Sequence, residues 1–383
     1  MKVLKKINKF LSRNNSIFHY NLEKHLDFLN GLPIPLNEIH RSFYQYKCQC
    51  FQKPGLVNFR NNFIAFFSII PVILFLLFKP GRGKTKTKEK QHHQAVFIFA
   101  GVENIVPLRL KQKYPNYAEV NFGKNWFLKT ADLKYIFKLK GYILSPYFLL
   151  KSIYKMAMYR AVIDEYSPNA IICSSEYSFT SSLLTWYCEQ NQVRHINVMH
   201  GEKLLNIRDS FFQFHECYVW DKHYVDLFNI LRAGENQFII DTPHSLFIKN
   251  TNSEPEYELT YYLAGETLDE LEQIKDVLHK IKIPDNKICI RPHPRYSDLN
   301  QIAKVFKPFT IENPREVKIE QSINNTKIIV SLYSTVLYQG FISGKQIVVD
   351  NLTQVSKFEK LKDLKFIVLS KPHLKISDLI TTK

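Results

Sequence analysis

Five residues in the second half of the chain combine a histidine with two arginines and two prolines. They read Arg291-Pro292-His293-Pro294-Arg295 and follow the apolar run KICI at 287–290. The prolines stiffen the loop, which would present His293 at a fixed angle. Histidine can donate a hydrogen bond to a phosphate oxygen or move a proton, and guanidinium groups bind anions. The pattern predicts an anion site carried by Arg291, His293, Pro294 and Arg295. The simpler alternative is a surface loop with a chance His-Pro pair.

Small hydroxyl side chains follow the next apolar run, KIIV at 327–330. They are Ser331, Ser334 and Thr335, and a helix is expected from 335 to about 343. Hydroxyls cap helix N-termini, where free backbone N–H groups also favour a phosphate. Plain capping would explain these residues equally well. Combined with the preceding Arg-Pro-His-Pro-Arg loop, they predict a phosphate-binding site.

Three residues in the first half are candidates for a general base. His200 and Glu202 flank Gly201 after the run VRHINVM, and Glu176 follows the run NAIIC at 169–173. Gly201 permits a tight turn, and either neighbour could deprotonate an acceptor hydroxyl. Glu176 competes for the same role from the neighbouring strand end. For each acid, a solvated loop is the alternative interpretation.

Short apolar runs alternating with longer amphipathic ones must position these residues. Strands are expected in a first set at 95–100, 169–173, 193–199, 216–220 and 237–240, and in a second set at 259–264, 287–290, 327–330 and 346–350. This alternation predicts parallel βαβ units. A polar segment at 241–256 with two prolines is the expected linker. The sequence therefore predicts an α/β protein with two Rossmann-like domains, at 91–245 and 246–383. Ligands of such sheets bind beyond the carboxyl ends of the strands.

Length and composition fit this architecture. The 383 residues are 45% hydrophobic and 23% charged, which excludes a disordered chain. The six cysteines include no Cys-x-x-Cys pair, so neither a zinc site nor a disulfide framework is expected.

Most of the net charge lies in residues 1–90. This segment has 16 Lys and Arg against 4 Asp and Glu, a balance of +12 out of +17 for the chain. It contains an uncharged run at 63–78, which is expected to form an apolar helix, followed by six Lys and Arg between Lys79 and Lys90.

Sixteen helical residues reach about 24 Å, less than the thickness of the hydrocarbon core of a membrane, and Pro71 would kink the helix. We expect an interfacial or re-entrant anchor at an anionic membrane surface. The alternative is a buried core helix beside a solvated loop, and no motif supports nucleic-acid binding.

Together these motifs resemble bacterial glycosyltransferases of the GT-B type that use CMP-activated sugars, the sialyltransferase-like enzymes of capsule, O-antigen and lipooligosaccharide synthesis. His293-Pro294 and Ser334-Thr335 match the His-Pro and Ser/Thr motifs of that group, whereas its acidic motif has no clear counterpart. The resemblance implies an inverting transfer of a nonulosonate, a sialic-acid-like sugar, from a CMP donor to a glycan or lipid-linked glycan. It also implies a peripheral enzyme on the cytoplasmic face of the bacterial inner membrane.

The chain also resembles teichoic-acid-type transferases, which use CDP-polyols and carry a His-Gly motif like His200-Gly201. A different GT-B donor and a non-catalytic glycan-assembly binding protein are further alternatives. No Asp-x-Asp sequence occurs, which makes a metal-bridged diphosphate donor less attractive. We therefore expect neither a metal nor another cofactor.

Overall fold

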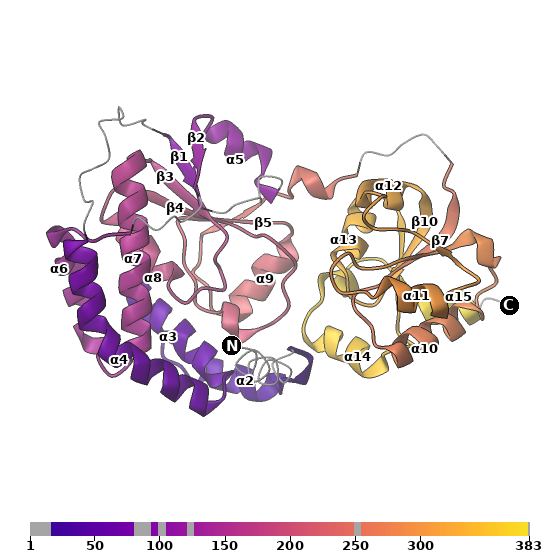
Figure 1. Ribbon diagram of the computed structural model, residues 1–383, viewed down its shortest axis with the longest axis horizontal. Coiled ribbons are helices and arrows are strands. Elements are labelled where there is room, and N and C mark those ends of the chain that lie inside the picture. The colour runs from indigo at the N-terminus through magenta and orange to yellow at the C-terminus, as the bar shows by residue number, and fades with distance from the viewer. Residues whose placement is uncertain (1–16, 80–92, 99–104, 121–125, 249–253, 382–383) are drawn as a thin grey trace. The chain divides into compact units, whose positions relative to one another are not determined.

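A computed structural model of the chain describes residues 17–79, 93–98, 105–120, 126–248 and 254–381, which form two compact units (Figure 1). The first unit runs to Pro243 without Gly201–Leu205, and the second contains Gly201–Leu205 and His244–Lys383. The chain divides at Pro243/His244, and the sequence predicts this boundary at 245/246. Part of the expected linker, 249–253, and most of the basic run after Lys79 lie outside the described residues.

The first unit is built on a parallel six-stranded sheet in the order β2-β1-β3-β4-β5-β6. Its strands are β1 (Ala95–Phe97), β2 (Tyr117–Glu119), β3 (Ala170–Cys173), β4 (Arg194–Val198), β5 (Glu216–Val219) and β6 (Phe238–Ile240). The central strands are buried almost throughout, as expected of a sheet covered by helices on both faces. The strand order changes direction between β1 and β3, so the loop after β3 lies at the expected ligand-binding edge.

Eight α-helices of the first unit lie in the part of the chain that the structure describes. They are α2 (Leu22–Asn30), α3 (Glu38–Phe51), α4 (Gly55–Phe78), α5 (Leu108–Lys113), α6 (Leu133–Lys138), α7 (Pro146–Tyr166), α8 (Ser181–Glu189) and α9 (Lys222–Ile230). The core between these helices and the sheet is rich in aromatic side chains, among them Phe148, Phe179 and Tyr187. Aromatic residues bury large areas and contribute strongly to such a core.

The second unit has its own parallel six-stranded sheet, in the order β12-β11-β10-β7-β8-β9. Its strands are β7 (Tyr257–Tyr262), β8 (Ile288–Arg291), β9 (Thr310–Ile311), β10 (Thr326–Ser331), β11 (Gln346–Val349) and β12 (Leu374–Lys375). With β7 counted as strand 1, this is the order 3-2-1-4-5-6 of dinucleotide-binding Rossmann folds. The switch point lies between β7 and β10. The predicted fold class, α/β with two Rossmann-like domains, is confirmed.

The helices of the second unit help to position the loops at the carboxyl edge of this sheet. They are α10 (Leu268–Leu278), α11 (Leu299–Val305), α12 (Ile319–Asn324), α13 (Thr335–Ile342), α14 (Val355–Asp363) and α15 (Ile376–Thr381). α10 begins with a capping box in which Thr267 and Glu270 bond each other's backbone N–H groups. α13 lies close to β10 because Gly340 has no side chain: a Cβ there would come within 2.5 Å of the Ile329 Cδ1.

The described N-terminal residues are counted with the first unit, whereas the sequence predicts a division at residue 90. The Arg232 guanidinium donates to the carbonyls of Leu29, Leu32 and Pro33, which fixes the end of α2 to the unit. Ser42 of α3 accepts a hydrogen bond from the Leu183 backbone N–H at 2.7 Å. These polar contacts between distant parts of the sequence produce no pattern that a single sequence displays.

The apolar helix is also longer than expected. α4 has 24 residues, which corresponds to about 36 Å, and Pro71 lies inside it without ending it. By length and composition alone, α4 is a helix that could cross a membrane. One side of α4 packs on the first unit through Ala65, Ile69, Val72 and Leu76. The other side is an exposed apolar face, from here called the outer face: Leu56, Phe59, Phe63, Ile64, Phe66, Phe67, Ile70, Leu74, Phe75 and Phe78.

Candidate active site

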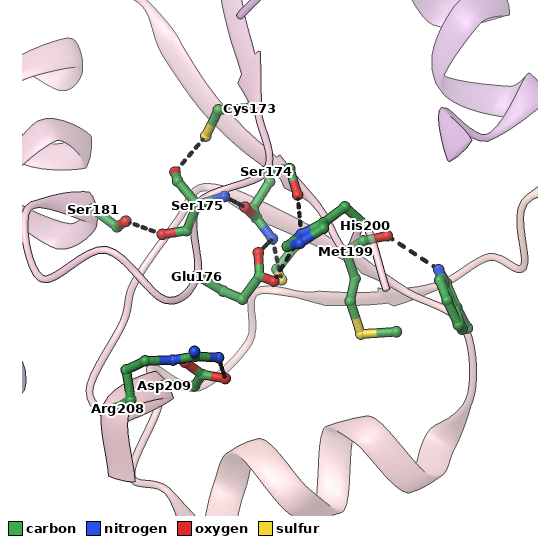
Figure 2. Close-up of polar contacts among 12 residues, drawn as sticks. Cys173, Ser174, Ser175, Glu176, Ser181, Met199, His200, Arg208 and Asp209 are labelled. Carbon is green, nitrogen blue, oxygen red and sulfur yellow. Dashed lines mark hydrogen bonds and ion pairs between the residues drawn. The ribbon is translucent and has the colours of Figure 1, made fainter. Parts of the chain in front are cut away.

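The carboxyl edge of the first sheet brings together two of the predicted base residues. β3 and β4 are parallel neighbours, so the loops that follow them begin at the same edge. Ser174 and Glu176 follow β3, and His200 follows β4 (Figure 2). Glu176 and His200 are 24 positions apart in the sequence, yet the neighbouring strands bring them into one cluster.

Glu176 and His200 form a pair with one buried and one exposed member. The His200 Nδ1 lies 3.4 Å from the Glu176 Oε1 and 2.7 Å from the Ser174 Oγ (Figure 2). The His200 side chain is 41% exposed, whereas the Glu176 side chain is fully buried. A proton on Nδ1 faces these oxygens, and Nε2 is then left to accept a proton from a hydroxyl. The buried carboxylate would stabilise the imidazolium that this transfer forms.

A buried amide holds Glu176 in place. The Asn197 Nδ2 donates to the Glu176 Oε2 at 3.1 Å, and the Asn197 Oδ1 accepts from the Ser175 backbone N–H at 2.8 Å. Asn197 lies within β4 at a fully buried position. It therefore fixes both the loop after β3 and the direction of the carboxylate.

Helix α3 supports the same loop from the N-terminal segment. The Gln45 Nε2 donates to the carbonyls of Glu176 at 2.8 Å and Arg208 at 3.0 Å. One turn later, the Gln49 Nε2 donates to the Tyr177 carbonyl at 2.8 Å. The N-terminal residues thus help to shape the candidate site, a role that sequence analysis missed. The only available signal would have been two glutamines four positions apart in an otherwise amphipathic helix.

Glu202 is placed differently from the prediction. It follows His200 by two positions, but Gly201–Leu205 belongs to the second unit, where the Leu205 N–H donates to the Leu364 carbonyl at 2.8 Å. Among the described residues, its Oε1 is buried and has no hydrogen-bond partner. Burial raises the pKa of Glu202 to about 8. At pH 7 this carboxyl is mostly protonated, which makes it a poorer proton acceptor than the Glu176–His200 pair.

The residues of the predicted anion site follow strands at the carboxyl edge of the second sheet. β8 and β10 both pair with β7 in parallel, so the loops after β8 and β10 flank the loop after β7 at one edge. This arrangement places the His293 loop and the Ser334 loop on either side of the switch point, where nucleotides bind in folds of this order.

His293 is held as a neutral hydrogen-bond donor. Its Nδ1 accepts the Arg295 backbone N–H at 3.1 Å, which assigns the ring proton to Nε2. The ring stacks on Tyr296 with centroids 4.5 Å apart. Burial lowers the pKa of His293, and the Arg295 charge lowers it further. The group therefore presents an Nε2–H at pH 7. Pro294 and Arg295 are exposed at the same loop.

Two predicted phosphate ligands instead bond to other residues inside the second unit. Arg291 is buried, pairs with Glu312 and donates to the Val317 carbonyl at 2.9 Å. Ser331 is buried as the last residue of β10, and its Oγ donates to the Tyr262 carbonyl at 2.8 Å. Both residues end strands with their side chains inside the domain. Donor contact by Arg291 and Ser331 stays a prediction, and their contacts inside the domain do not favour it.

Ser334 and Thr335 lie at the start of α13, as predicted. Ser334 is the N-cap, and its Oγ accepts the Val336 backbone N–H at 3.3 Å. Both residues are half-buried. The first turn of the helix leaves further N–H groups and the positive end of its dipole at this edge.

Sequence analysis missed the loop after β7. The Glu266 carboxylate accepts the backbone N–H groups of Ala264 and Gly265 at 2.9 Å each. Gly265 has a φ of +140°, and a Cβ there would lie 3.1 Å from the Tyr296 Cβ. Only glycine suits both conditions, so this loop packs directly against the His293 loop. A glycine directly after the expected strand at 259–264 was the signal that could have identified it.

The described residues contain no group of three or more His, Cys, Asp or Glu side chains arranged to hold a metal ion.

No protein-family model matches the sequence, and no curated protein matches it. Among solved structures, the chain is similar to the glycosyltransferase of kitacinnamycin, with 8% identity, a TM-score of 0.44, and 72% of this chain and 85% of that chain covered. It is similar to the Anabaena protein HepE, solved with UDP and glucose, with 8% identity, a TM-score of 0.40 and coverages of 76% and 97%. A UDP-GlcNAc 2-epimerase from Neisseria meningitidis bound to UDP-GlcNAc gives 10% identity, a TM-score of 0.42 and coverages of 75% and 88%. These identities and TM-scores assign no activity to this chain.

Proposed function

We propose that this protein is an inverting, metal-independent glycosyltransferase of bacterial surface polysaccharide synthesis, with a CMP-linked nonulosonate as its donor. The observation that carries the proposal is the neutral His293, which has its proton on Nε2 and lies in the loop after β8, beside the switch point of a sheet with the order 3-2-1-4-5-6. The capped N-terminus of α13 lies at the same edge of that sheet.

The donor side supplies stabilisation of the leaving group. When the bond between the sugar and the phosphate breaks, negative charge develops on the nucleotide phosphate. His293, Arg295, Ser334, Thr335 and the N–H groups of α13 are suited to bind this charge. One positioned donor of this kind contributes about 3 kcal/mol in other enzymes. A CMP-sugar has a single phosphate, which these groups can serve without a metal.

The acceptor side supplies the base. His200 accepts the proton of an acceptor hydroxyl at Nε2, and Glu176 stabilises the charged ring from the interior. The deprotonated oxygen attacks the anomeric carbon on the face opposite the phosphate, a carbon–oxygen bond forms, and CMP leaves with the bonding electrons. This single displacement inverts the anomeric configuration. The acceptor is a glycan or a lipid-linked glycan.

The outer face of α4 supports a location on the cytoplasmic face of the bacterial inner membrane. Its ten side chains are 51–79% exposed, and no charged residue lies between Asn61 and Phe78. Because the opposite side of α4 belongs to the core of the first unit, we favour a helix lying in the membrane interface over one crossing the bilayer. The basic balance of residues 1–90 fits an anionic lipid surface.

A thermal-shift screen tests the donor. The protein is melted with CMP, CDP, UDP, GDP and their sugars, with and without EDTA. A ligand at a hundredfold excess over its dissociation constant should stabilise the fold by about 2.7 kcal/mol. Protection by CMP-sugars that survives EDTA is the expected result. Protection by UDP or GDP alone would contradict the CMP donor.

One alternative has a specific observation in its favour. His200-Gly201 matches the His-Gly motif of the teichoic-acid-type transferases, and His200 is exposed in the structure. Stronger protection by CDP-glycerol or CDP-ribitol than by CMP-sugars would support polyol-phosphate transfer. A non-catalytic glycan-binding protein would instead be stabilised by no nucleotide.

A further inference from the structure

An exposed aromatic ring lies directly beside the Glu176–His200 pair of the first unit. Tyr177 follows Glu176 in the loop after β3 and is 44% exposed. The centroid of its ring lies 5.7 Å from the centroid of the His200 ring, at an interplanar angle of 65°. The Arg208 Cζ lies 5.8 Å from the centroid of the same Tyr177 ring. Tyr177 therefore places an accessible apolar surface next to the imidazole.

Helix α3 fixes the backbone of Tyr177 and of Arg208 together. The Gln49 Nε2, which donates to the Tyr177 carbonyl, also donates to the Arg208 carbonyl at 3.2 Å. The Gln52 Nε2 donates at 2.6 Å to the Asn206 Oδ1, and this oxygen also accepts the Arg208 backbone N–H at 2.9 Å. Both side chains therefore start from fixed backbone positions. A surface that is ordered before its ligand arrives loses less entropy on binding.

The Arg208 guanidinium is oriented by one carboxylate and keeps N–H groups for a ligand. Its Nε donates to the Asp209 Oδ1 at 2.7 Å, and its Nη2 donates to the Asp209 Oδ2 at 3.2 Å (Figure 2). The Arg208 side chain is 47% exposed, whereas the Asp209 side chain is buried. In the described part of the chain, these are the side-chain hydrogen bonds of Arg208. Because a guanidinium has five N–H donors, the others are left to donate to a ligand.

The charges beside Tyr177 favour a neutral ligand. The Asp209 carboxylate balances the Arg208 guanidinium, and Glu176 adds a second buried carboxylate. Two carboxylates thus stand against one guanidinium, an arrangement that disfavours a further anion. A neutral sugar ring has an apolar C–H face and a rim of hydroxyl groups. This combination matches an exposed aromatic ring with guanidinium donors beside it.

We propose that Tyr177 and Arg208 form the acceptor subsite and bind a neutral sugar ring. The C–H face of the sugar packs on the Tyr177 ring, and the N–H groups of Arg208 donate to its hydroxyl oxygens. A hydroxyl of the bound sugar then faces His200. The acceptor role of this sugar rests on the proposed function, whereas binding of a neutral sugar does not depend on any transfer.

Saturation-transfer NMR of the full chain measures sugar binding with no nucleotide present. The probes are the neutral disaccharides maltose, lactose, mannobiose and chitobiose, with sialyllactose as the charged counterpart of lactose. We expect a neutral disaccharide to bind the wild type through its ring C–H protons. Tyr177→Ala should raise the dissociation constant of that disaccharide about tenfold, because a stacked ring is lost. Arg208→Lys should also weaken binding, because an ammonium group replaces the planar fork of donors.

Two further variants separate sugar stacking from support of the loop. Tyr177→Phe keeps the flat ring and should bind like the wild type, whereas Tyr177→Leu keeps apolar bulk without the ring and should bind as weakly as Tyr177→Ala. Equal affinities of Tyr177→Phe and Tyr177→Leu would show a merely structural role and overturn the subsite. The matched control is Phe137→Ala, which removes an aromatic ring that is 73% exposed on α6 of the same unit. It should keep the wild-type affinity.

Three other results would overturn the subsite. They are wild-type affinity in Tyr177→Ala, equal losses in Tyr177→Ala and Phe137→Ala, and a wild type that binds none of the neutral disaccharides. Tighter binding of sialyllactose than of every neutral disaccharide would overturn the neutral ligand.

Failure of the proposed function gives a different result. If a neutral disaccharide binds through Tyr177 but receives no sugar from any nucleotide donor, the glycosyltransferase assignment fails and the sugar subsite stands. If transfer occurs and Tyr177→Ala leaves the KM for the acceptor unchanged, the proposed function stands and the subsite fails.

Discussion

In the proposed mechanism, the Glu176–His200 pair divides the work of a base between a buried carboxylate and an exposed imidazole. We predict that His200→Ala and Glu176→Gln each lower turnover by about 10²–10⁴-fold, the range for loss of general-base catalysis, while leaving donor binding intact. Glu202→Gln is the matched comparison, because its carboxyl is mostly neutral at pH 7 and should matter less. The measurement is initial sugar transfer together with thermal-shift titration of the donor. Normal turnover in His200→Ala would assign the base elsewhere.

A second histidine of the first unit should control stability rather than activity. His195 is fully buried between Tyr159, whose hydroxyl lies 3.0 Å from Nε2, and Thr185, whose Oγ1 lies 2.8 Å from Nδ1. Burial lowers the pKa of His195 to about 3. Below pH 6.5 the unfolded chain binds a proton that the native state does not bind, so the free energy of unfolding falls as pH drops towards 3.

This histidine alone contributes a slope of up to about 1.4 kcal/mol per pH unit in that window. Chemical unfolding at a series of pH values should therefore show a smaller slope for His195→Gln than for the wild type. If the free energy of unfolding changes with pH at the same slope in His195→Gln and the wild type, another group is responsible for the pH dependence.

At the residue level, the sequence predicted which side chains lie at strand ends but not which way they point. Arg291 and Ser331 are the last residues of their strands, and the alternation of a strand sends their side chains into the domain. His293 and Ser334 lie two and three positions later, where the chain has left the sheet. If a predicted strand end is wrong by one position, a side chain that points into the domain is expected to point out of it. The ends of strands are the least certain part of such predictions.

Among the elements of the second unit, the position of α13 decides whether Ser334 and the helix N-terminus reach the carboxyl edge. We predict that Gly340→Ala weakens donor binding about tenfold and lowers stability by roughly 1–3 kcal/mol, because the added Cβ would press α13 away from Ile329. Gly141→Ala is the control, since nothing lies within 4 Å of a Cβ there. The measurements are nucleotide titration and chemical unfolding. Unchanged donor affinity in Gly340→Ala would separate α13 from the donor site.

Helix α4 makes a distinct prediction for each of its sides. Phe63 and Phe67 belong to the outer face, with ring centroids 5.1 Å apart. Phe63→Ser/Phe67→Ser should lower binding to phosphatidylcholine vesicles at least tenfold, because each buried phenylalanine side chain contributes about 1.5–3 kcal/mol, and it should leave the melting temperature unchanged.

Ile69→Ser, on the packed side, should show the reverse: a lower melting temperature with vesicle binding retained. Equal vesicle binding by Phe63→Ser/Phe67→Ser and the wild type would remove α4 from the membrane contact.

The extent of α4 shows why element-level prediction was incomplete. The uncharged run at 63–78 was visible, but the helix starts at Gly55 and includes the polar Asn58 and Asn62. Asn58 donates to the Cys50 carbonyl at 2.7 Å, and Asn62 contacts Tyr46 and Tyr147, so both serve the packing of α4 on α3 and α7. Tertiary contacts therefore decided where the helix begins.

For the whole molecule, the alternation of apolar runs was enough to predict two parallel α/β domains. The strand orders were beyond reach, because several orders are compatible with the same alternation. The same limit applies to Gly201–Leu205, a five-residue segment that belongs to the second unit while its neighbours belong to the first. Glu202 was predicted in the first domain, whereas the structure groups it with the second unit.

Transfer of labelled sugar into the membranes of the cells that make this protein tests the central claim most directly. The label is supplied in turn on CMP-, UDP-, GDP- and CDP-linked donors, with EDTA present, to the wild type and to His293→Ala. We predict incorporation from the CMP-linked nonulosonate by the wild type and at least a hundredfold loss in His293→Ala, whose fold should be intact because the side chain is partly exposed and makes only local contacts. Incorporation from no donor, or equal incorporation by His293→Ala, would contradict the assignment of this protein as a glycosyltransferase acting through His293.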